Sequence, residues 1–377
     1  MHLKYLSVSN FKNIEQLDID CSPILNCFVG NNGEGKTNLL DGIYYLSMCK
    51  SKFVASDYVN IRDNENYFML KAQYFRDNND ENVSCGIKRN GKKSFKYNSK
   101  EYKKLSEHIG VIPLVFITPS DTSLINNGSE ERRKFLNSVI SQTDKQYLDS
   151  LIRYNNILMN RNKMLKYRIS DIDLSFIDTL SEQMSIYGQM IYEKRKTMLT
   201  SFLPVFQEIY DVISGGKDIV SLLYRSDLEK ENLKSLLAAN LERDCALQYT
   251  SVGVHRDDLI MKINGRTLKN SGSQGQQKTY LIAMMMTQFR IIKQHAGISP
   301  ILLLDDIFDK LDIERVERLI SFVTGNGFGQ IFLTDSNKSR LDTLLEKTAA
   351  NYKLFKMNSG NVELLQSSIP CDVANPL

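Results

Sequence analysis

Residues 29–40 read VGNNGEGKTNLL, and the eight residues from Gly30 to Thr37 match the pattern G-x-x-x-x-G-K-[ST] at each fixed position. An apolar run, 24–29, precedes this loop, and a helical pattern, 36–49, follows it. Glycines let the backbone curl with its N–H groups toward phosphate oxygens, and the following helix adds its positive end. The stretch therefore predicts a phosphate-binding loop between a strand and a helix.

Single side chains of this loop have predicted roles. Lys36 can reach the β- and γ-phosphates of a nucleotide, and the Thr37 hydroxyl can ligate Mg²⁺. A chance glycine-rich turn is the alternative, but both flanking patterns disfavour it. We expect ATP and Mg²⁺ as cofactors, with the nucleotide held by Gly30, Asn31, Asn32, Gly33, Glu34, Gly35, Lys36, Thr37 and Asn38.

A second motif, ILLLDD at 301–306, is an apolar strand pattern that ends in two acids. A P-loop enzyme needs a carboxylate beside its metal, so Asp305 is expected to hold Mg²⁺ directly or through water. Asp306 is placed to orient or deprotonate the attacking water, and Asp306 and Lys36 are the predicted catalytic residues. A strand that ends in Asp is a weak signal alone, and the phosphate loop in the same chain strengthens it.

A third motif, GSQGQQK at 272–278, opens a long helical pattern that continues to His295. Polar donors around a glycine at a helix N-terminus make a second anion site, with Ser273, Gly275 and Gln276 as predicted nucleotide ligands. A polar helix cap is the simpler alternative. Because the two anion sites are far apart in the sequence, we expect a head-to-tail dimer. In it, this loop of one subunit caps the γ-phosphate held by the other.

The composition excludes several classes of protein. Of the 377 residues 42% are hydrophobic, which excludes disorder of the whole chain, and the net charge of +4 is too small to identify a nucleic-acid partner. The longest apolar run, Tyr280–Met286, is far shorter than the roughly 20 residues of a membrane span, so no membrane partner is expected. The cysteines are scattered without a CxxC pair, which favours a cytoplasmic location.

The middle of the chain has helical periodicity. Ser129 is a predicted N-cap, and apolar stripes follow at Leu148, Leu151, Leu158 and Leu165 and at Ile177, Leu180, Met184, Tyr187, Ile191 and Met198. These stripes predict either an antiparallel helical hairpin or two ordinary amphipathic helices on a core. Arg132, Arg133 and Lys134 are candidate DNA contacts, as is the basic cluster 194–196, although a solvated helix face is the usual meaning of such clusters.

The order of these motifs resembles that of ABC-type ATPases, with 273–277 as the signature loop and 309–312 as the D-loop. More closely, the chain is similar to the RecF family of bacterial recombination mediators. The matching stretches cover nearly the whole chain: SNFKNIE at 9–15, VGNNGEGKTNLLDGIYYL at 29–46, TPSD at 118–121, GSEERRKFLN at 128–137, VGVHRDDL at 252–259, GSQGQQK at 272–278 and LLLDDIFDKLD at 302–312.

The resemblance implies a fold and a domain order. The expected fold class is α/β, an ABC-type P-loop ATPase head with a mixed sheet, flanking helices and an inserted, mainly helical domain. The expected segments are 1–121 for the first part of the head, 122–240 for the insertion, 241–365 for the second part of the head and 366–377 for a flexible tail.

The resemblance also implies an activity in recombinational repair and replication restart. An ATP-induced homodimer is expected to bind gapped, single-stranded and duplex DNA and to help load RecA, together with RecR- and RecO-type mediators. Slow hydrolysis would release the DNA, and Asp306, where ABC enzymes generally have Glu, fits a slow ATPase. The motif 332–335 lacks the usual ABC histidine, and 309–312 lacks the usual serine. An SMC-like structural head, an ABC-type nuclease-related ATPase and a transporter subunit are the alternatives.

Overall fold

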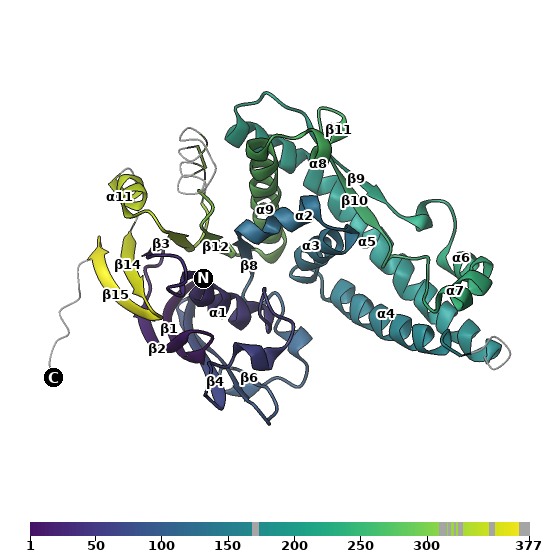
Figure 1. Ribbon diagram of the computed structural model, residues 1–377, viewed down its shortest axis with the longest axis horizontal. Coiled ribbons are helices and arrows are strands. Elements are labelled where there is room, and N and C mark those ends of the chain that lie inside the picture. The colour runs from purple at the N-terminus through teal and green to yellow at the C-terminus, as the bar shows by residue number, and fades with distance from the viewer. Residues whose placement is uncertain are drawn as a thin grey trace. The chain divides into compact units, whose positions relative to one another are not determined.

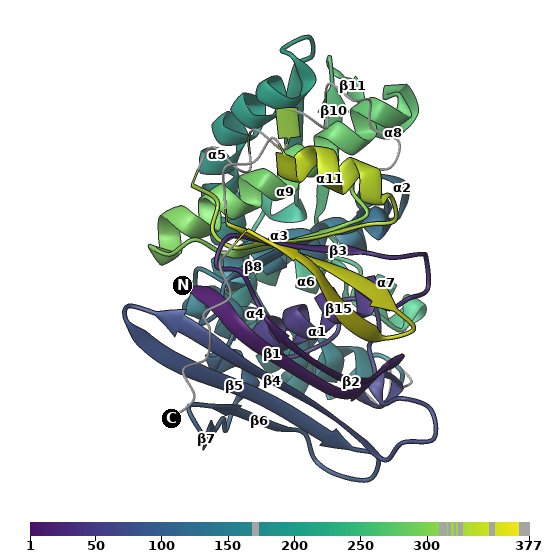
Figure 2. The ribbon, with the colours of Figure 1, turned by 90° about the vertical axis from the view of Figure 1, so that its left-hand side faces the viewer.

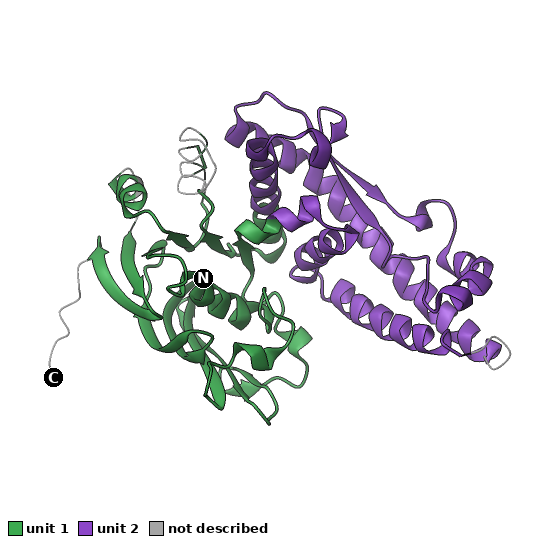
Figure 3. Cartoon of the chain, in the orientation of Figure 1, with its two compact units in different colours: residues 1–121, 288–377 green, residues 122–287 purple. Residues whose placement is uncertain are grey.

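The computed structural model divides the chain into two compact units, residues 1–121 with 288–377 and residues 122–287 (Figure 3). The residues that it describes are 1–167, 173–308, 315, 318–319, 322, 327–346 and 351–368. Among them, no helix combines the length and the apolar character that a membrane span needs. Each unit is described by itself.

The first unit contains a six-stranded sheet in the order β15-β14-β3-β13-β12-β8. Adjacent strands from β14 to β8 pair in parallel, and β15 pairs antiparallel with β14. The strands are β3 (Leu25–Val29), β8 (Leu114–Ile117), β12 (Ile301–Asp305), β13 (Ile331–Asp335), β14 (Tyr352–Asn358) and β15 (Asn361–Ser367). Every residue of β3, β8, β12 and β13 is buried, as expected for parallel strands covered on both faces. Their carboxyl ends therefore meet at one edge.

A second sheet of the same unit is antiparallel, in the order β2-β1-β4-β5-β6-β7. Its strands are β1 (His2–Phe11), β2 (Ile14–Asp20), β4 (Tyr67–Arg76), β5 (Asn79–Lys88), β6 (Ser94–Tyr97) and β7 (Lys100–Glu101). Burial alternates along β4 and along the second half of β2, so one face turns inward. Helix α1 (Lys36–Met48) lies between the two sheets, and its Leu39, Ile43 and Leu46 join one core with residues of both (Figure 2).

The second unit is mainly helical. Its helices are α2 (Ser123–Asn126), α3 (Ser129–Ser141), α4 (Lys145–Met164), α5 (Leu174–Ser214), α6 (Leu233–Ala239), α7 (Leu241–Leu247) and α8 (Leu268–Ser271). A small sheet is formed by β9 (Val220–Arg225), β10 (Asp258–Ile263) and β11 (Arg266–Thr267), in the order β11-β10-β9. Helix α9 (Gln274–Ala296) begins in this unit and crosses the division after residue 287.

Helices α4 and α5 form the antiparallel hairpin that was one of the two expectations (Figure 1). Contacts between them run in opposite directions along the two helices: Asp144 with Lys194, Ser150 with Met190 and Arg161 with Ser181. The predicted stripe on α5 is buried at each position except Tyr187, which is partly exposed.

Two local predictions for this unit are wrong. Of the predicted α4 stripe, Leu165 is buried, but the leucines at 148, 151 and 158 are partly exposed, because the buried face of the helix consists of Tyr147, Ser150, Tyr154, Ile157 and Arg161. These buried positions have the same three- and four-residue spacing as the leucines, but they lie one residue nearer the N-terminus. Ser129 is not the N-cap of α3, since the helix already includes it and Gly128 holds the cap position.

The bounds of the compact units differ in part from the expected domain bounds. The first division coincides with the expected boundary at 121/122, whereas the second lies at 287/288 rather than at 240/241. The reason is that β10 pairs along its length with β9, which keeps residues 241–287 with the helical unit. Of the expected tail, 366 and 367 belong to β15, and 369–377 lie outside the described residues, as does the predicted D-loop at 309–312.

Candidate functional site

The phosphate loop connects β3 to α1 in the first unit. Gly33 and Gly35 have φ angles of 86° and 105°, a left-handed conformation that glycine adopts without strain. A Cβ on Gly30 would lie 2.6 Å from the backbone oxygen of Met357, so only glycine fits there. The predicted strand–loop–helix arrangement is therefore present, and its glycines stand where the backbone needs them.

Lys36 lies inside the curl of the loop. Its Nζ donates to the backbone oxygens of Gly30, at 2.7 Å, and Asn31, at 3.0 Å, and the residue is only 4% exposed. A buried ammonium held by backbone carbonyls can bind an anion as well, and a phosphate group is such an anion. This placement suits Lys36 for the predicted role.

Asp305, at the end of β12, joins the two predicted motifs. Its Oδ2 accepts a hydrogen bond from Thr37 Oγ1 at 2.8 Å, and its Oδ1 accepts one from Thr334 Oγ1 at 2.7 Å. Burial raises the pKa of the Asp305 carboxyl, the two threonine hydroxyls oppose this, and the charge of Asp306 adds to it. The sheet order explains why Thr37 and Asp305 are in contact, because only β13 lies between β3 and β12.

These oxygen atoms fit a magnesium ion. Mg²⁺ prefers hard oxygen ligands and binds with one or two protein side chains plus waters and phosphate oxygens. The Thr37 hydroxyl and the Asp305 carboxylate converge at hydrogen-bond distance next to the loop that would hold the phosphates. The chemistry of this donor set therefore matches the predicted metal position at Thr37 and Asp305.

Asp306 directly follows β12 and has a φ of 44°. Its backbone N–H donates to Thr334 Oγ1 at 3.1 Å, which ties the turn to β13, and the residue is partly exposed. A carboxylate beside the metal position, with access to water, is suited to act on an attacking water. At the end of β13, where ABC enzymes have histidine after the strand, Asp335 accepts a hydrogen bond from Arg340 at 3.0 Å.

The signature loop belongs to the second unit. Ser273 Oγ accepts from the Gln276 N–H at 3.2 Å, and the Gln276 side chain accepts from the Ser273 N–H at 2.9 Å. These reciprocal bonds form a capping box at the start of α9, which is the simpler alternative for this motif. Ser273 is exposed, and Gly275 and Gln276 are partly exposed, so their contact with a nucleotide of a second subunit stays a prediction.

The basic cluster of α3 makes ion pairs and hydrogen bonds within the second unit. Arg132 binds Asp258 through two nitrogens, at 2.6 and 3.2 Å, and Arg133 donates to the Asp257 backbone oxygen at 2.7 Å. Lys134 pairs with Glu131 at 2.8 Å but is 60% exposed. Arg132 and Arg133 thus fasten α3 to the start of β10, and a DNA contact remains a prediction for all three.

The motif VGVHRDDL, at 252–259, is structural as well. Asp257 pairs with Arg195 at 2.8 Å, and both side chains are at most 2% exposed. Arg195 therefore does not form a basic surface with its neighbours 194 and 196. The guanidinium of Arg256 lies 5.6 Å from the ring centre of Tyr249.

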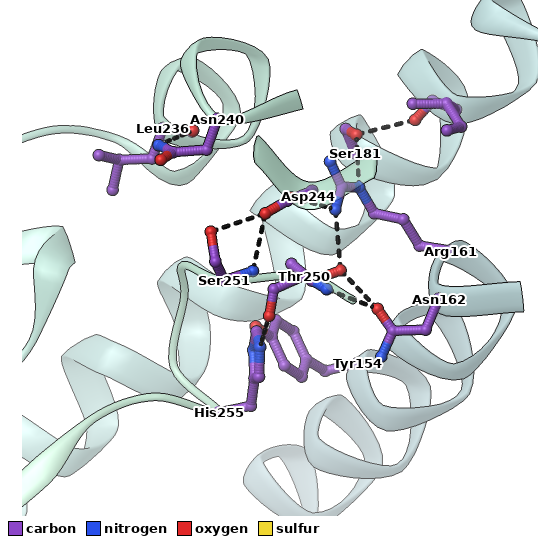
Figure 4. Close-up of polar contacts among 11 residues, drawn as sticks. Tyr154, Arg161, Asn162, Ser181, Leu236, Asn240, Asp244, Thr250, Ser251 and His255 are labelled. Atoms are coloured by element: carbon purple, nitrogen blue, oxygen red, sulfur yellow. Dashed lines mark hydrogen bonds and ion pairs between the residues drawn. The ribbon is translucent and has the colours of Figure 1, made fainter. Parts of the chain in front are cut away.

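A second buried ion pair joins α4 to α7, as Figure 4 shows. Arg161 donates to Asp244 at 2.7 Å and to Thr250 at 2.8 Å, and both charged side chains are fully buried. Nearby, His255 contacts Tyr154 Oη at 2.8 Å through Nδ1 and the Thr250 backbone oxygen at 2.9 Å through Nε2. Burial lowers the pKa of His255 to about 4, so the ring is neutral at pH 7 and has a structural role.

Sequence reasoning missed three groups of residues. Thr334 orients Asp305, the pairs Arg161–Asp244 and Arg195–Asp257 hold the hairpin, and Asn13 contacts the phosphate loop. The resemblance contained two signals, since SNFKNIE includes Asn13 and VGVHRDDL includes Asp257. No spacing rule connects any of these residues to its partner.

The parallel sheet, the glycine loop and the acid-bearing strand next but one to the loop strand define a P-loop ATPase head of the ABC type. The model for the RecF/RecN/SMC N-terminal domain matches residues 2–362. The chain belongs to the RecF family within this class. It is 48% identical to the DNA replication and repair protein RecF of Parabacteroides distasonis, over 97% of this chain and 100% of that protein. Identity to the Flavobacterium johnsoniae protein of the same name is 43%, over 95% and 100%.

Solved structures agree with this assignment. A structure of the recombination mediator protein RecF with ATP, from the RecFOR pathway, has a TM-score of 0.87 at 29% identity and covers 97% of this chain and 98% of that one. An Smc head bound to the C-terminal winged-helix domain of ScpA has a TM-score of 0.59 at 14% identity, with 98% of each chain covered. The latter likeness supports the fold alone.

Proposed function

We propose that this protein is an ATP-dependent DNA-binding protein of recombinational repair and replication restart. The observation that carries the proposal is the hydrogen bond from Thr37 to Asp305, which brings the phosphate loop and the acid of the second motif together as a Mg–ATP site requires. Relatives named DNA replication and repair protein RecF, and the solved complex of RecF with ATP, support the biological assignment.

The proposed hydrolysis uses residues of the first unit. Lys36 exchanges its loop carbonyls for the β- and γ-phosphates, and Thr37 and Asp305 hold Mg²⁺, which supplies charge neutralisation to the phosphates when bound. Asp306 orients the water that attacks the γ-phosphate. Because Asp is one methylene shorter than the Glu of other ABC enzymes, hydrolysis is slow, and ATP acts chiefly as a clamp with hydrolysis as its release.

Dimerisation follows from the signature loop. Ser273, Gly275 and Gln276 of one subunit cap the γ-phosphate held by the second subunit, so ATP joins two copies head to tail. Two copies combine their basic surfaces, which is how a chain of net charge +4 binds DNA. By analogy with the RecFOR pathway, the dimer acts in the cytoplasm on gapped, single-stranded and duplex DNA, works with RecR- and RecO-type partners and helps load RecA.

Sedimentation velocity with and without Mg–ATP and a gapped duplex tests the proposal. We expect a monomer without ATP, a dimer with ATP and a dimer–DNA complex with both. Lys36→Met should abolish both ATP-dependent species, since the ammonium that binds the phosphates is lost. Exposed Lys100 on β7 offers a matched control, Lys100→Met, which should assemble like the wild type. A wild-type monomer in saturating ATP and DNA would refute the dimer.

A further inference from the structure

Two β-turns that are distant in sequence enclose the phosphate loop. The first, between β1 and β2, contains Asn13. Asn13 Nδ2 donates to the Gly33 backbone oxygen at 3.2 Å, and Oδ1 accepts from Asn38 Nδ2 at 2.8 Å. A Cβ on Gly35 would lie 3.0 Å from the Asn13 amide. One side chain thus connects the loop to the first turn of α1.

The second turn connects β14 to β15. Asn358 and Asn361 pair across the hairpin and leave Ser359 and Gly360, with φ angles of 50° and 82°, as a two-residue turn with the positive φ angles of type I′. The Ser359 N–H donates to the Glu34 carboxylate, and the Gly360 N–H donates to the Glu34 backbone oxygen at 2.9 Å. Successive N–H groups of a turn form a concave anion site, and here it holds a loop residue.

The two turns also contact each other. A Cβ on Gly360 would lie 2.6 Å from the Asn13 backbone oxygen and 3.2 Å from Ile14 Cα. At the start of the loop, Gly30 approaches Met357 as closely, since its Cβ would lie 2.6 Å from that backbone oxygen. The loop is therefore held at its start, its middle and its end by segments that are not adjacent in sequence.

We propose that the β14–β15 turn is a positioning element of the nucleotide site, which together with Asn13 keeps the phosphate loop in its binding curl. A glycine-rich loop has many alternative conformations, and a ligand that binds only one of them loses affinity in proportion to its population. The turn favours that one conformation by holding Glu34. The turn also engages the carboxylate of Glu34, a negative charge within the loop that receives the phosphates. This inference rests on ATP binding as proposed above.

Gly360→Ala tests the positioning element, and the chain offers a matched control. Gly265 occupies the same place in the two-residue turn between β10 and β11, with a φ of 75°, but a Cβ there would meet nothing within 4 Å. Both substitutions impose the same backbone strain, and only Gly360→Ala presses on Asn13. We expect Gly360→Ala to weaken binding of a fluorescent ATP analogue by about tenfold. Gly265→Ala should stay within about twofold of the wild type.

Glu34 provides a second pair of variants if Gly360→Ala fails to fold. Glu34→Gln and Glu34→Ala both remove the charge, but Gln keeps an acceptor for the Ser359 N–H. We expect Glu34→Gln, which keeps the acceptor, to lose less affinity for the analogue than Glu34→Ala, which should bind about tenfold more weakly than the wild type. Thermal unfolding without nucleotide should be alike for the two, because the effect is on the population of the loop conformation.

Each outcome has a defined meaning. Equal affinities within both pairs, with a wild type that binds, would overturn the positioning role and leave ATP binding intact. If the wild type fails to bind the analogue, as Lys36→Met is expected to fail, the proposed function itself is overturned. Steady-state hydrolysis adds a further check, since a raised KM with an unchanged kcat identifies an effect on binding.

Discussion

Thr334 donates a hydrogen bond to Asp305 Oδ1 at 2.7 Å, from the strand that lies between the phosphate-loop strand and the acid-bearing strand. Thr37 holds the other carboxylate oxygen at 2.8 Å. The predicted metal ligand is thus fixed from two sides before any metal arrives. A carboxylate that is oriented by its neighbours loses less entropy when it binds a cation, so Thr334 contributes to the site without being a ligand.

Thr334→Val should therefore weaken Mg²⁺ binding at the ATPase site. Valine keeps the shape of the side chain but cannot donate to Asp305, and loss of such a supporting hydrogen bond costs about 10- to 100-fold in metal affinity or activity. The measurement is ATP hydrolysis as a function of Mg²⁺ concentration. Thr334→Ser retains the hydroxyl and should behave nearly as the wild type. Identical Mg²⁺ curves for Val and wild type would contradict the role.

Isosteric substitution of Asp305 and of Asp306 should have different effects on assembly. Asp306→Asn removes the group that orients water but leaves the metal ligand, so we expect a trapped ATP-bound dimer and no hydrolysis. Asp305→Asn weakens the hold on Mg²⁺ and should leave the protein monomeric in ATP. Analytical ultracentrifugation with ATP and Mg²⁺ distinguishes the two. The assignment of roles fails if both variants sediment alike.

The buried pair Arg161–Asp244 should dominate the stability of the helical hairpin. Arg161→Met leaves Asp244 buried without its cation, and breaking such a pair costs about 3–5 kcal/mol in the free energy of unfolding. Arg153→Met on the same helix breaks an exposed, solvent-screened pair with Asp149 and should change the free energy of unfolding little. Urea unfolding of both variants gives the comparison. A similar loss in both would show that burial of the pair is not decisive.

Stability should fall in acid through His255. Its pKa is about 4 in the folded protein, below the ordinary value of 6.5, so the unfolded chain binds the proton first as the pH falls. This group leaves the free energy of unfolding unchanged above pH 6.5. As the pH drops toward 4, the free energy of unfolding declines by up to roughly 3 kcal/mol. The free energy of unfolding, measured at several pH values for wild type and His255→Asn, checks this. The difference in pH dependence between the two proteins should lie in that window, and parallel curves would argue against it.

Within the basic cluster of α3, the exposed residue should affect DNA binding and a mostly buried residue should affect stability. Lys134 is 60% exposed, so Lys134→Ala should weaken binding to gapped duplex and reduce the salt slope by about one, with unfolding unchanged. Arg132→Ala removes a pair of which both side chains are 13% exposed and should lower the free energy of unfolding instead. Wild-type DNA affinity in Lys134→Ala would remove this residue from the DNA surface.

Much of the ATPase site could be predicted from contiguous stretches of sequence. Gly30 to Thr37 specify a curled loop because glycine permits the left-handed angles and the flanking patterns specify a strand and a helix. ILLLDD specifies a buried strand with acids at its end, since an unbroken apolar run fits a strand covered on both faces. The three- and four-residue spacing on α5 likewise predicted its buried face.

Only the tertiary structure decided which distant residues meet. Thr37 and Asp305 are 268 positions apart, and Glu34 and Ser359 are 325 positions apart, so their contacts depend on strand order and hairpin placement. Arg195 stands in a basic run but is buried against Asp257, because the fold and not the local sequence sets the environment of a charge. Backbone conformation follows from neighbouring residues, whereas the partner of a side chain follows from packing. For that reason the sequence predicted the phosphate loop, and the fold supplied the residues that hold it.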